Sequence, residues 1–233
     1  MTVLAIGFIP AAPLLIPALA GADTGRDHEL RSCVRSTVAA VVAAAQSCSD
    51  PTVVVVGLAD EASTYDGTWD FAPLGLAIRG PGTGRLPTPL GIGAWFLDEA
   101  AYTGQREYVG VPDRAPAAVC AALGASLAQS RDVALLVVGD GSARRDEKAP
   151  GWLDPRAAEF DAAVIRALAA GQPEEVLALD PDIARDLLAA GRAPWQAAAG
   201  AARGSAWVTK VLWDDAPYGV GYVVATWLTA PSA

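Results

Sequence analysis

The chain of 233 residues contains a single histidine, His28, and this scarcity limits the metal chemistry that it can support. A non-haem iron(II) site typically uses two histidines and one carboxylate, which one imidazole cannot supply. The three cysteines, Cys33, Cys48 and Cys120, show no C-x-x-C spacing, so the sequence indicates neither a zinc site nor a disulfide framework. We interpret His28 as an exposed residue near the start of a helix.

Positive charge is also scarce. Lys and Arg number 17 against 26 Asp and Glu, for a net charge of −9, which argues against nucleic acid or an anionic membrane surface as a partner. No apolar run reaches the roughly 20 residues of a membrane span. The first twenty residues are uncharged, but they lack an initial Lys or Arg and are interrupted by Pro10, Pro13 and Pro17. We therefore expect a strand and a proline-rich loop here, not a signal peptide, and a cytoplasmic protein.

Short apolar runs alternate with helical patterns along the chain, which predicts a single α/β domain built as a three-layer α/β/α sandwich. The segment 214–219 is short enough to join the last two strands as an antiparallel hairpin, so the sheet is expected to be mixed and mostly parallel. The expected strands are Val3–Ile9, Thr52–Leu58, Tyr108–Val111, Val133–Val138, Ala206–Trp213 and Gly219–Trp227. The expected helices are Arg26–Gln46, Pro89–Ala101, Ala115–Gln129 and a helical insertion around residues 154–203.

Two Asp-Pro pairs mark helix starts within this insertion. Asp154 and Asp180 each precede a proline and are expected to cap the helix that follows. The second of these helices is expected to bury Ile183, Leu187 and Leu188 and to end at Gly191.

Catalytic and binding groups in open α/β sheets tend to lie just beyond the carboxyl ends of the strands. Four loops qualify: 10–13, 57–64, 139–148 and 214–219. If the strands before them are parallel, the first three loops meet at one edge of the sheet. The irregular segment Asp60–Arg85, rich in Gly, Pro and Thr, is interpreted as a further loop on this face.

The loop after Val133–Val138, GDGSARRDEK, carries the densest polar chemistry. Its arginines and backbone N–H groups could hold a carboxylate or phosphate. Alternatively, the arginines form an internal network with Asp140, Asp146, Glu147 or Asp154. Ser142 has no histidine base, which excludes a serine hydrolase. The residues predicted to bind a ligand are Asp140, Ser142, Arg144, Arg145 and Lys148, with Asp215 and Tyr218 on the opposite side.

Carboxylates could also hold a hard cation at this edge. The candidates are Asp60, Glu61, Asp140, Asp214 and Asp215, although aspartates at such positions more often cap turns. Asp140 and Lys148 are the weak candidates for metal-free acid/base chemistry.

The motifs P-x-x-P-L-L after the first strand, VVVV-G after the second, VVGDGS and the C-terminal DDAPYGVGY occur in the order seen in class III extradiol ring-cleaving dioxygenases. The chain resembles the LigB-like catalytic subunits of these enzymes over nearly its whole length. This resemblance implies an iron(II) held by two histidines and a carboxylate, with a third histidine as acid/base. The family's two histidine-ligand positions fall at Ala11 and Ala59 here, and its acid/base position falls at Ala143.

These observations favour a dioxygenase-like protein that has lost its iron site and its ring-cleaving activity. We expect it to bind a small anionic or aromatic ligand in the ancestral cleft, without a cofactor. Two alternatives stay open. One is an active oxidoreductase that uses a carboxylate-bound metal or metal-free acid/base groups, and the other is a non-catalytic assembly subunit, which could form a homodimer.

Overall fold

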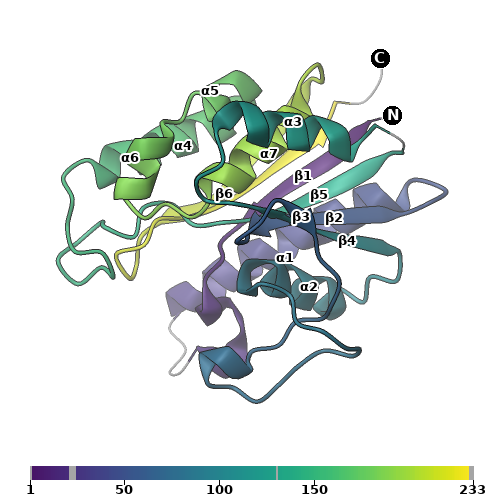
Figure 1. Cartoon of the computed structure of the whole chain (residues 1–233), viewed down its shortest axis with the longest axis horizontal. Helices are drawn as coiled ribbons and strands as arrows, with labels where there is room; N and C mark the ends of the chain where they lie inside the picture. The colour runs from purple at the N-terminus through teal and green to yellow at the C-terminus, as the bar shows by residue number, and fades with distance from the viewer. Residues whose placement is uncertain (1, 21–24, 130, 231–233) are drawn as a thin grey trace.

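A computed structural model describes residues 2–20, 25–129 and 131–230. They form one seven-stranded sheet with helices on both faces (Figure 1), which confirms the expected α/β architecture. The strand order is β3-β4-β2-β5-β1-β7-β6. The strands are β1 (Val3–Ile9), β2 (Thr52–Leu58), β3 (Ser63–Thr64), β4 (Gln105–Val111), β5 (Val133–Val138), β6 (Trp207–Asp215) and β7 (Tyr222–Thr229).

The four central strands β4, β2, β5 and β1 are parallel, and β3, β7 and β6 are added by antiparallel pairing at the two sides. The sheet is therefore mixed with a mostly parallel centre, as predicted. In β5 all six residues are buried, because helices cover both of its faces. The carboxyl ends of β1, β2 and β5 lie side by side, so the loops that follow them meet at one edge.

The helices divide between the two faces of the sheet. On one face lie α1 and α2, and on the other lie α3 to α7 (Figure 1). The α-helices are α1 (Gly25–Gln46), α2 (Thr88–Glu99), α3 (Ala117–Leu127), α4 (Ala157–Ala170), α5 (Pro173–Leu177), α6 (Pro181–Asp186) and α7 (Arg192–Ala202). Within the described loops lie three single-turn 3-10 helices: η1 (Pro13–Leu15), η2 (Pro17–Leu19) and η3 (Ala72–Leu74). Among the described helices, none combines the length and the apolar character that crossing a membrane would take.

The helical segment before the last two strands exists, but some of its details differ from the prediction. Asp180 does cap α6, since its side chain accepts from the N–H groups of Asp182 and Ile183. Asp154 does not cap α4, because that helix begins later and its N-cap is Arg156; Asp154 instead accepts the Arg156 N–H in the preceding turn.

The burial expected along α6 is wrong for two of three residues. Leu187 is fully buried, but Ile183 is 36% exposed and Leu188 is 52% exposed. Leu188 also has a φ of 56°, a left-handed conformation that ends the helical path. The helix therefore ends at Asp186, several residues before Gly191, and the side chain of Leu188 is left outside the core.

Helices α3 and α7 pack closely through glycines. A Cβ on Gly124 would lie 1.7 Å from the carbonyl oxygen of Ala197, and one on Gly200 would lie 2.2 Å from that of Ala121. The two backbones touch without intervening side chains, which fixes α7 against α3 and, through Trp195, against the centre of the sheet.

Candidate functional site

The three positions that the dioxygenase resemblance assigns to metal and acid/base chemistry carry methyl groups. The side chains of Ala11, Ala59 and Ala143 offer no donor atom to a metal. In the described ranges, no three His, Cys, Asp or Glu side chains are close enough to hold a metal ion. His28 is exposed on α1. The residues that the structure describes therefore do not fit a centre of two histidines and one carboxylate.

Asp140, in the loop after β5, binds the loop after β1. Its Oδ1 accepts a 2.8 Å hydrogen bond from the backbone N–H of Ala11, and its backbone carbonyl accepts from the N–H of Gly191 at 2.7 Å. Burial raises the pKa of Asp140 to about 7, and the bond from Ala11 lowers it only in part. The carboxyl group thus joins the loops after β5 and β1 at the edge of the sheet.

Tyrosines and a second carboxyl group lie near Asp140. The pKa of Tyr222 is raised, first by burial and then by the charges of Asp140, Tyr218 and Asp27. The hydroxyl of Tyr218 donates to the carboxylate of Asp27 at 2.8 and 2.9 Å. Tyr218 is thus bound to α1, and the residue is 46% exposed.

Ser142 is fully buried and serves the backbone around it. Its N–H donates to Oδ1 of Asp161 at 2.8 Å, and its hydroxyl donates to the carbonyl of Leu187 at 3.2 Å while accepting from the N–H of Arg144 at 3.1 Å. A side chain with these partners and no exposed surface is not placed to contact a ligand.

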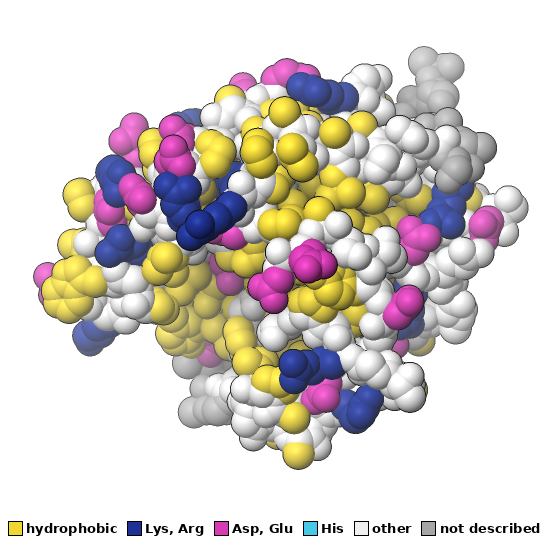
Figure 2. Space-filling view, viewed as in Figure 1, with side chains coloured by type: hydrophobic (Ala, Val, Ile, Leu, Met, Phe, Trp, Pro, Cys, Tyr) yellow, Lys and Arg dark blue, Asp and Glu magenta, His cyan; other side chains and the backbone are white. Residues whose placement is uncertain are grey.

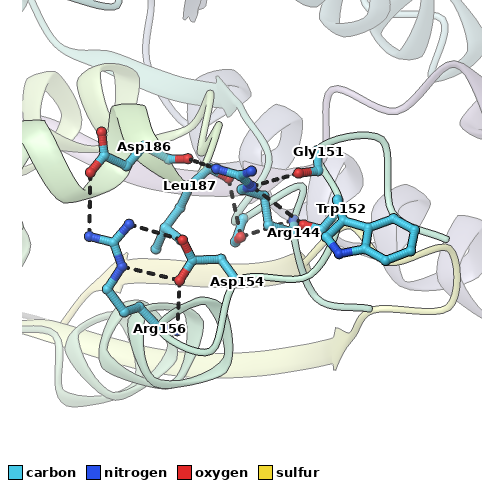
Figure 3. Close-up of polar contacts among 8 residues, drawn as sticks. Arg144, Gly151, Trp152, Asp154, Arg156, Asp186 and Leu187 are labelled. Atoms are coloured by element: carbon cyan, nitrogen blue, oxygen red, sulfur yellow. Dashed lines mark hydrogen bonds and ion pairs between the residues drawn. The ribbon is translucent and has the colours of Figure 1, made fainter. Parts of the chain in front are cut away.

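The guanidinium groups of Arg144 and Arg145 are bound within the protein. Arg144 donates to the carbonyls of Gly151 at 2.7 Å and Asp186 at 2.9 Å (Figure 3). Arg145 forms an ion pair of 2.9 Å with the buried carboxylate of Asp161. The internal network that the sequence left as an alternative therefore exists, but its acceptors are not the acids expected in that alternative.

A second ion-pair group lies beside Arg144. Arg156 pairs with Asp154 at 2.9 Å and with Asp186 at 3.3 Å (Figure 3), and its hydrogen bonds lower the pKa of Asp154 to about 2. Figure 2 shows charges of both signs gathered on the side of α4 and α6. The indole of Trp152 points away from these contacts, so the network leaves it exposed.

The other predicted residues are dispersed. Lys148 is exposed, and its backbone N–H donates to Asp146. Asp215 is exposed and pairs with Arg26 at 3.3 Å. Of the seven residues predicted to bind a ligand, Arg145 and Asp215 line one cavity, of about 200 Å³, together with Tyr222 and Asp161. Asp214 also lines this cavity, whereas Asp60 lies elsewhere along the edge.

A larger pocket, of about 680 Å³, lies at the carboxyl ends of β2 and β4. We call it the β2–β4 pocket. Its lining includes Ala59, which falls at a family ligand position, and Asp60, one of the carboxylates predicted as candidates for a hard cation. The other polar residues of the lining were not predicted as site residues: Tyr65, Arg85, Thr88, Asp113 and Arg114. Arg85 and Arg114 lie 29 positions apart. One signal was present in the sequence, because Arg114 closely follows the strand that ends at Val111, and Arg85 ends the segment interpreted as a loop of this face.

Comparison with known proteins supports the fold only. No protein-family model matches the sequence, and no curated protein matches it. A crystal structure of an uncharacterized protein from Escherichia coli K12 is similar, with a TM-score of 0.52 over 97% of this chain and 99% of that chain. The two sequences are 14% identical. At that identity the similarity extends to the arrangement of helices and strands and not to activity.

Proposed function

We propose that this chain is a dioxygenase-like protein without an iron centre that binds a small anionic or aromatic ligand at the carboxyl edge of its sheet. The observation that carries this proposal is the relation between Ala11 and Asp140. A family ligand position bears a methyl group, and its backbone N–H donates to the carboxyl group of Asp140. The β2–β4 pocket stays open at the same edge and includes another of the family positions, Ala59.

This arrangement separates binding from redox chemistry. Open α/β sheets bind ligands beyond the carboxyl ends of their strands whether or not they hold a metal. At the carboxyl edge of this sheet, Ala11, Ala59 and Ala143 lack the donor atoms that would hold iron, while the β2–β4 pocket is open to a ligand. Binding is thus the function that these residues support best.

The test combines elemental analysis with a binding screen of the full chain. Protein purified after iron supplementation is expected to contain iron well below one atom per chain and to leave catechols intact. Thermal unfolding is then followed with benzoate, catechol, succinate, tartrate and glycerol 3-phosphate, and at least one is expected to raise Tm in a saturable manner. Stoichiometric iron with ring cleavage, or no response to any of these compounds, would contradict the proposal.

A second candidate, an assembly subunit, is favoured by one surface feature. Trp152 is 62% exposed with a φ of 62°, and Leu188 is 52% exposed beside Gly151. Large apolar side chains in left-handed conformations are uncommon, and exposed apolar surface often marks an interface. We take a second copy of this chain as the occupant, because charges of both signs surround these residues. Light scattering of the wild type and of Trp152→Ser tests this: a dimer that the substitution disrupts supports it, and a monomeric wild type rejects it.

A further inference from the structure

Two arginines of the β2–β4 pocket are not engaged by the rest of the described chain. Arg85 and Arg114 are exposed, and neither makes an ion pair or a side-chain hydrogen bond with another residue in the ranges that the structure describes. Most of the described arginines do the opposite, as the pairs of Arg35 with Glu99 and of Arg145 with Asp161 illustrate. In a protein of net charge −9, two unengaged guanidinium groups at one pocket need an explanation.

The backbone of Arg85 is held in place. It forms an isolated bridge with Thr68, and the next residue, Leu86, donates its N–H to the Thr68 carbonyl at 3.0 Å. Gly67 lets the chain approach closely, since a Cβ there would lie 3.1 Å from the nitrogen of Arg85, and its φ of 147° is unfavourable for other residues. The backbone of Arg85 is thus fixed, and the guanidinium can move only by rotation about the bonds of the Arg85 side chain.

The backbone around Arg114 is also held in place, in this case by a buried arginine. The buried guanidinium of Arg192 donates to the carbonyls of Asp113 and Ala115, on either side of Arg114. The N–H of Ala115 also donates to the carbonyl of Pro112 at 3.0 Å. Both arginines of the pocket therefore combine a fixed backbone with an unengaged side chain, a combination suited to binding because little backbone order must be gained.

The walls of the pocket are also rigid. Prolines from three segments line it: Pro73, Pro87, Pro89 and Pro112. Each proline ring fixes φ near −65°, so these walls lose little conformational entropy when a ligand enters. The N–H of Ala59 donates to the carbonyl of Val111 at 3.2 Å, which ties the loops after β2 and β4 together at the mouth of the pocket.

Acceptors line the pocket together with the arginines. Asp60 and Asp113 contribute carboxylates, and Thr88 contributes a hydroxyl. None of the ion pairs within 4.0 Å in the described chain joins these carboxylates to Arg85 or Arg114. A ligand that satisfies both sets of groups must carry an anionic group for the arginines and hydroxyl donors for the carboxylates.

We propose that the β2–β4 pocket binds a small hydroxylated anion, a hydroxycarboxylate or a sugar phosphate. Arg85 and Arg114 hold its carboxylate or phosphate, and Asp60 and Asp113 accept hydrogen bonds from its hydroxyl groups. This inference rests on the proposed function in placing the ligand at the carboxyl edge, and it adds the residues and the ligand class. Its rival is a pocket in which the arginines turn to Asp60 and Asp113 and satisfy them without any ligand.

Calorimetric titration of the full chain with matched anions tests the ligand class. Tartrate carries two hydroxyl groups that succinate lacks. Glycerol 3-phosphate carries a hydroxylated carbon chain that inorganic phosphate lacks. The hydroxylated member of at least one pair is expected to bind about tenfold more tightly than its partner, because its hydroxyl groups donate hydrogen bonds to the pocket carboxylates. The pair that shows the difference distinguishes a carboxylate site from a phosphate site. Equal binding within both pairs, or no binding, overturns the inference.

Substitution tests the residues. Arg85→Gln and Arg114→Gln are each expected to weaken binding by about tenfold or more, and Asp60→Asn to reduce the preference for the hydroxylated anion. Arg166→Gln is the matched control: it removes an exposed arginine of α4 that has no ion pair in the described chain and does not line this pocket. All four positions are on the surface, so Tm without ligand is expected to change little, which circular dichroism verifies.

The outcomes separate this inference from the proposed function. Anion binding that is unchanged in Arg85→Gln and Arg114→Gln overturns the assignment to the pocket, yet leaves a ligand-binding protein. Iron-dependent ring cleavage together with Arg-dependent binding of tartrate or glycerol 3-phosphate overturns the proposed function and retains the pocket.

Discussion

The Oδ1 atom of Asp140 lies 2.8 Å from the backbone nitrogen of Ala11 and accepts its hydrogen bond. The two residues are 129 positions apart and follow two neighbouring parallel strands, β5 and β1. In the family that the sequence resembles, the position of Ala11 carries a metal ligand. Here the backbone N–H at that position donates to the carboxyl group of Asp140, so a hydrogen bond between protein groups, and not a shared metal ion, joins the two loops.

The raised pKa of Asp140 predicts a pH dependence of stability. Asp140 has a pKa of about 7 in the folded protein against an ordinary value of 3.8, so between pH 4 and pH 7 the folded state holds a proton that the unfolded chain has released. The free energy of unfolding should therefore fall as the pH rises through this range, by at most about 4 kcal/mol, and level off above pH 7. Urea unfolding at a series of pH values measures this slope.

Asp140→Asn isolates the contribution, because the amide oxygen can still accept from Ala11 while the proton equilibrium is removed. The variant should show a flatter profile than the wild type between pH 4 and pH 7. Asp161, whose pKa is also raised, is present in both proteins, so its contribution cancels in the difference. Asp60→Asn, at an exposed carboxyl group, should keep the wild-type slope. Identical slopes in Asp140→Asn and the wild type would show that Asp140 titrates near its ordinary pKa.

The central strands could be predicted closely because burial on both faces leaves a continuous apolar run. The residue ranges of β1, β2 and β5 agree with the prediction at both ends. The two residues of β3 were missed, since Ser63 and Thr64 are exposed and have no apolar pattern; their strand exists only through pairing with β4. A strand can thus be predicted where burial requires a run of apolar residues. It cannot be predicted where only pairing with a neighbouring strand creates it.

The candidate site was less predictable, because the partners of charged side chains are set by the fold. The arginines at 144 and 145 were expected either to bind a ligand or to pair with acids that are mostly in their own loop. The structure instead brings Asp161 and the carbonyl of Asp186 to them, 16 and 42 positions away. Conversely, Arg85 and Arg114 share a pocket because the segments around β2 and β4 meet, which no local spacing indicates.

Removing Arg145 should destabilise the protein through the carboxylate that it leaves behind. Asp161 is 4% exposed and also accepts the Ser142 N–H, so Arg145→Ala would leave a buried charge without its cation. We expect a loss of about 2–4 kcal/mol in the free energy of unfolding, measured by urea denaturation. Adding Asp161→Asn to Arg145→Ala should restore part of the lost free energy of unfolding, because the neutral amide removes the buried charge and still accepts from the Ser142 N–H. Arg203→Ala, which breaks an exposed pair with Glu174, should cost less than about 1 kcal/mol.

Arg192 should act on the β2–β4 pocket from a distance. It is 1% exposed and donates to the carbonyls of Asp113 and Ala115 and to the side chain of Gln196. Arg192→Met keeps much of the side-chain volume but leaves these acceptors unsatisfied, at an expected cost of about 2–4 kcal/mol. Hydrogen exchange should show faster opening of residues 113–115, where the N–H of Ala115 donates to the carbonyl of Pro112, and the affinity for hydroxylated anions should fall as well. A variant that is destabilised but retains wild-type exchange in this segment would exclude the positioning role.

The close packing of α3 against α7 predicts a large effect from one methyl group. A Cβ on Gly124 would lie 1.7 Å from the carbonyl oxygen of Ala197 and 2.7 Å from its carbonyl carbon, so Gly124→Ala must push the helices apart. Because backbone atoms cannot rotate away as a side-chain end can, we expect a loss of about 3 kcal/mol or more in the free energy of unfolding. Gly25→Ala is the matched control, since Gly25 also lies in a helix and nothing is within 4 Å of its added Cβ. It should be neutral or raise stability by up to about 1 kcal/mol. Similar unfolding midpoints for the two variants would mean that α3 and α7 do not approach this closely in solution.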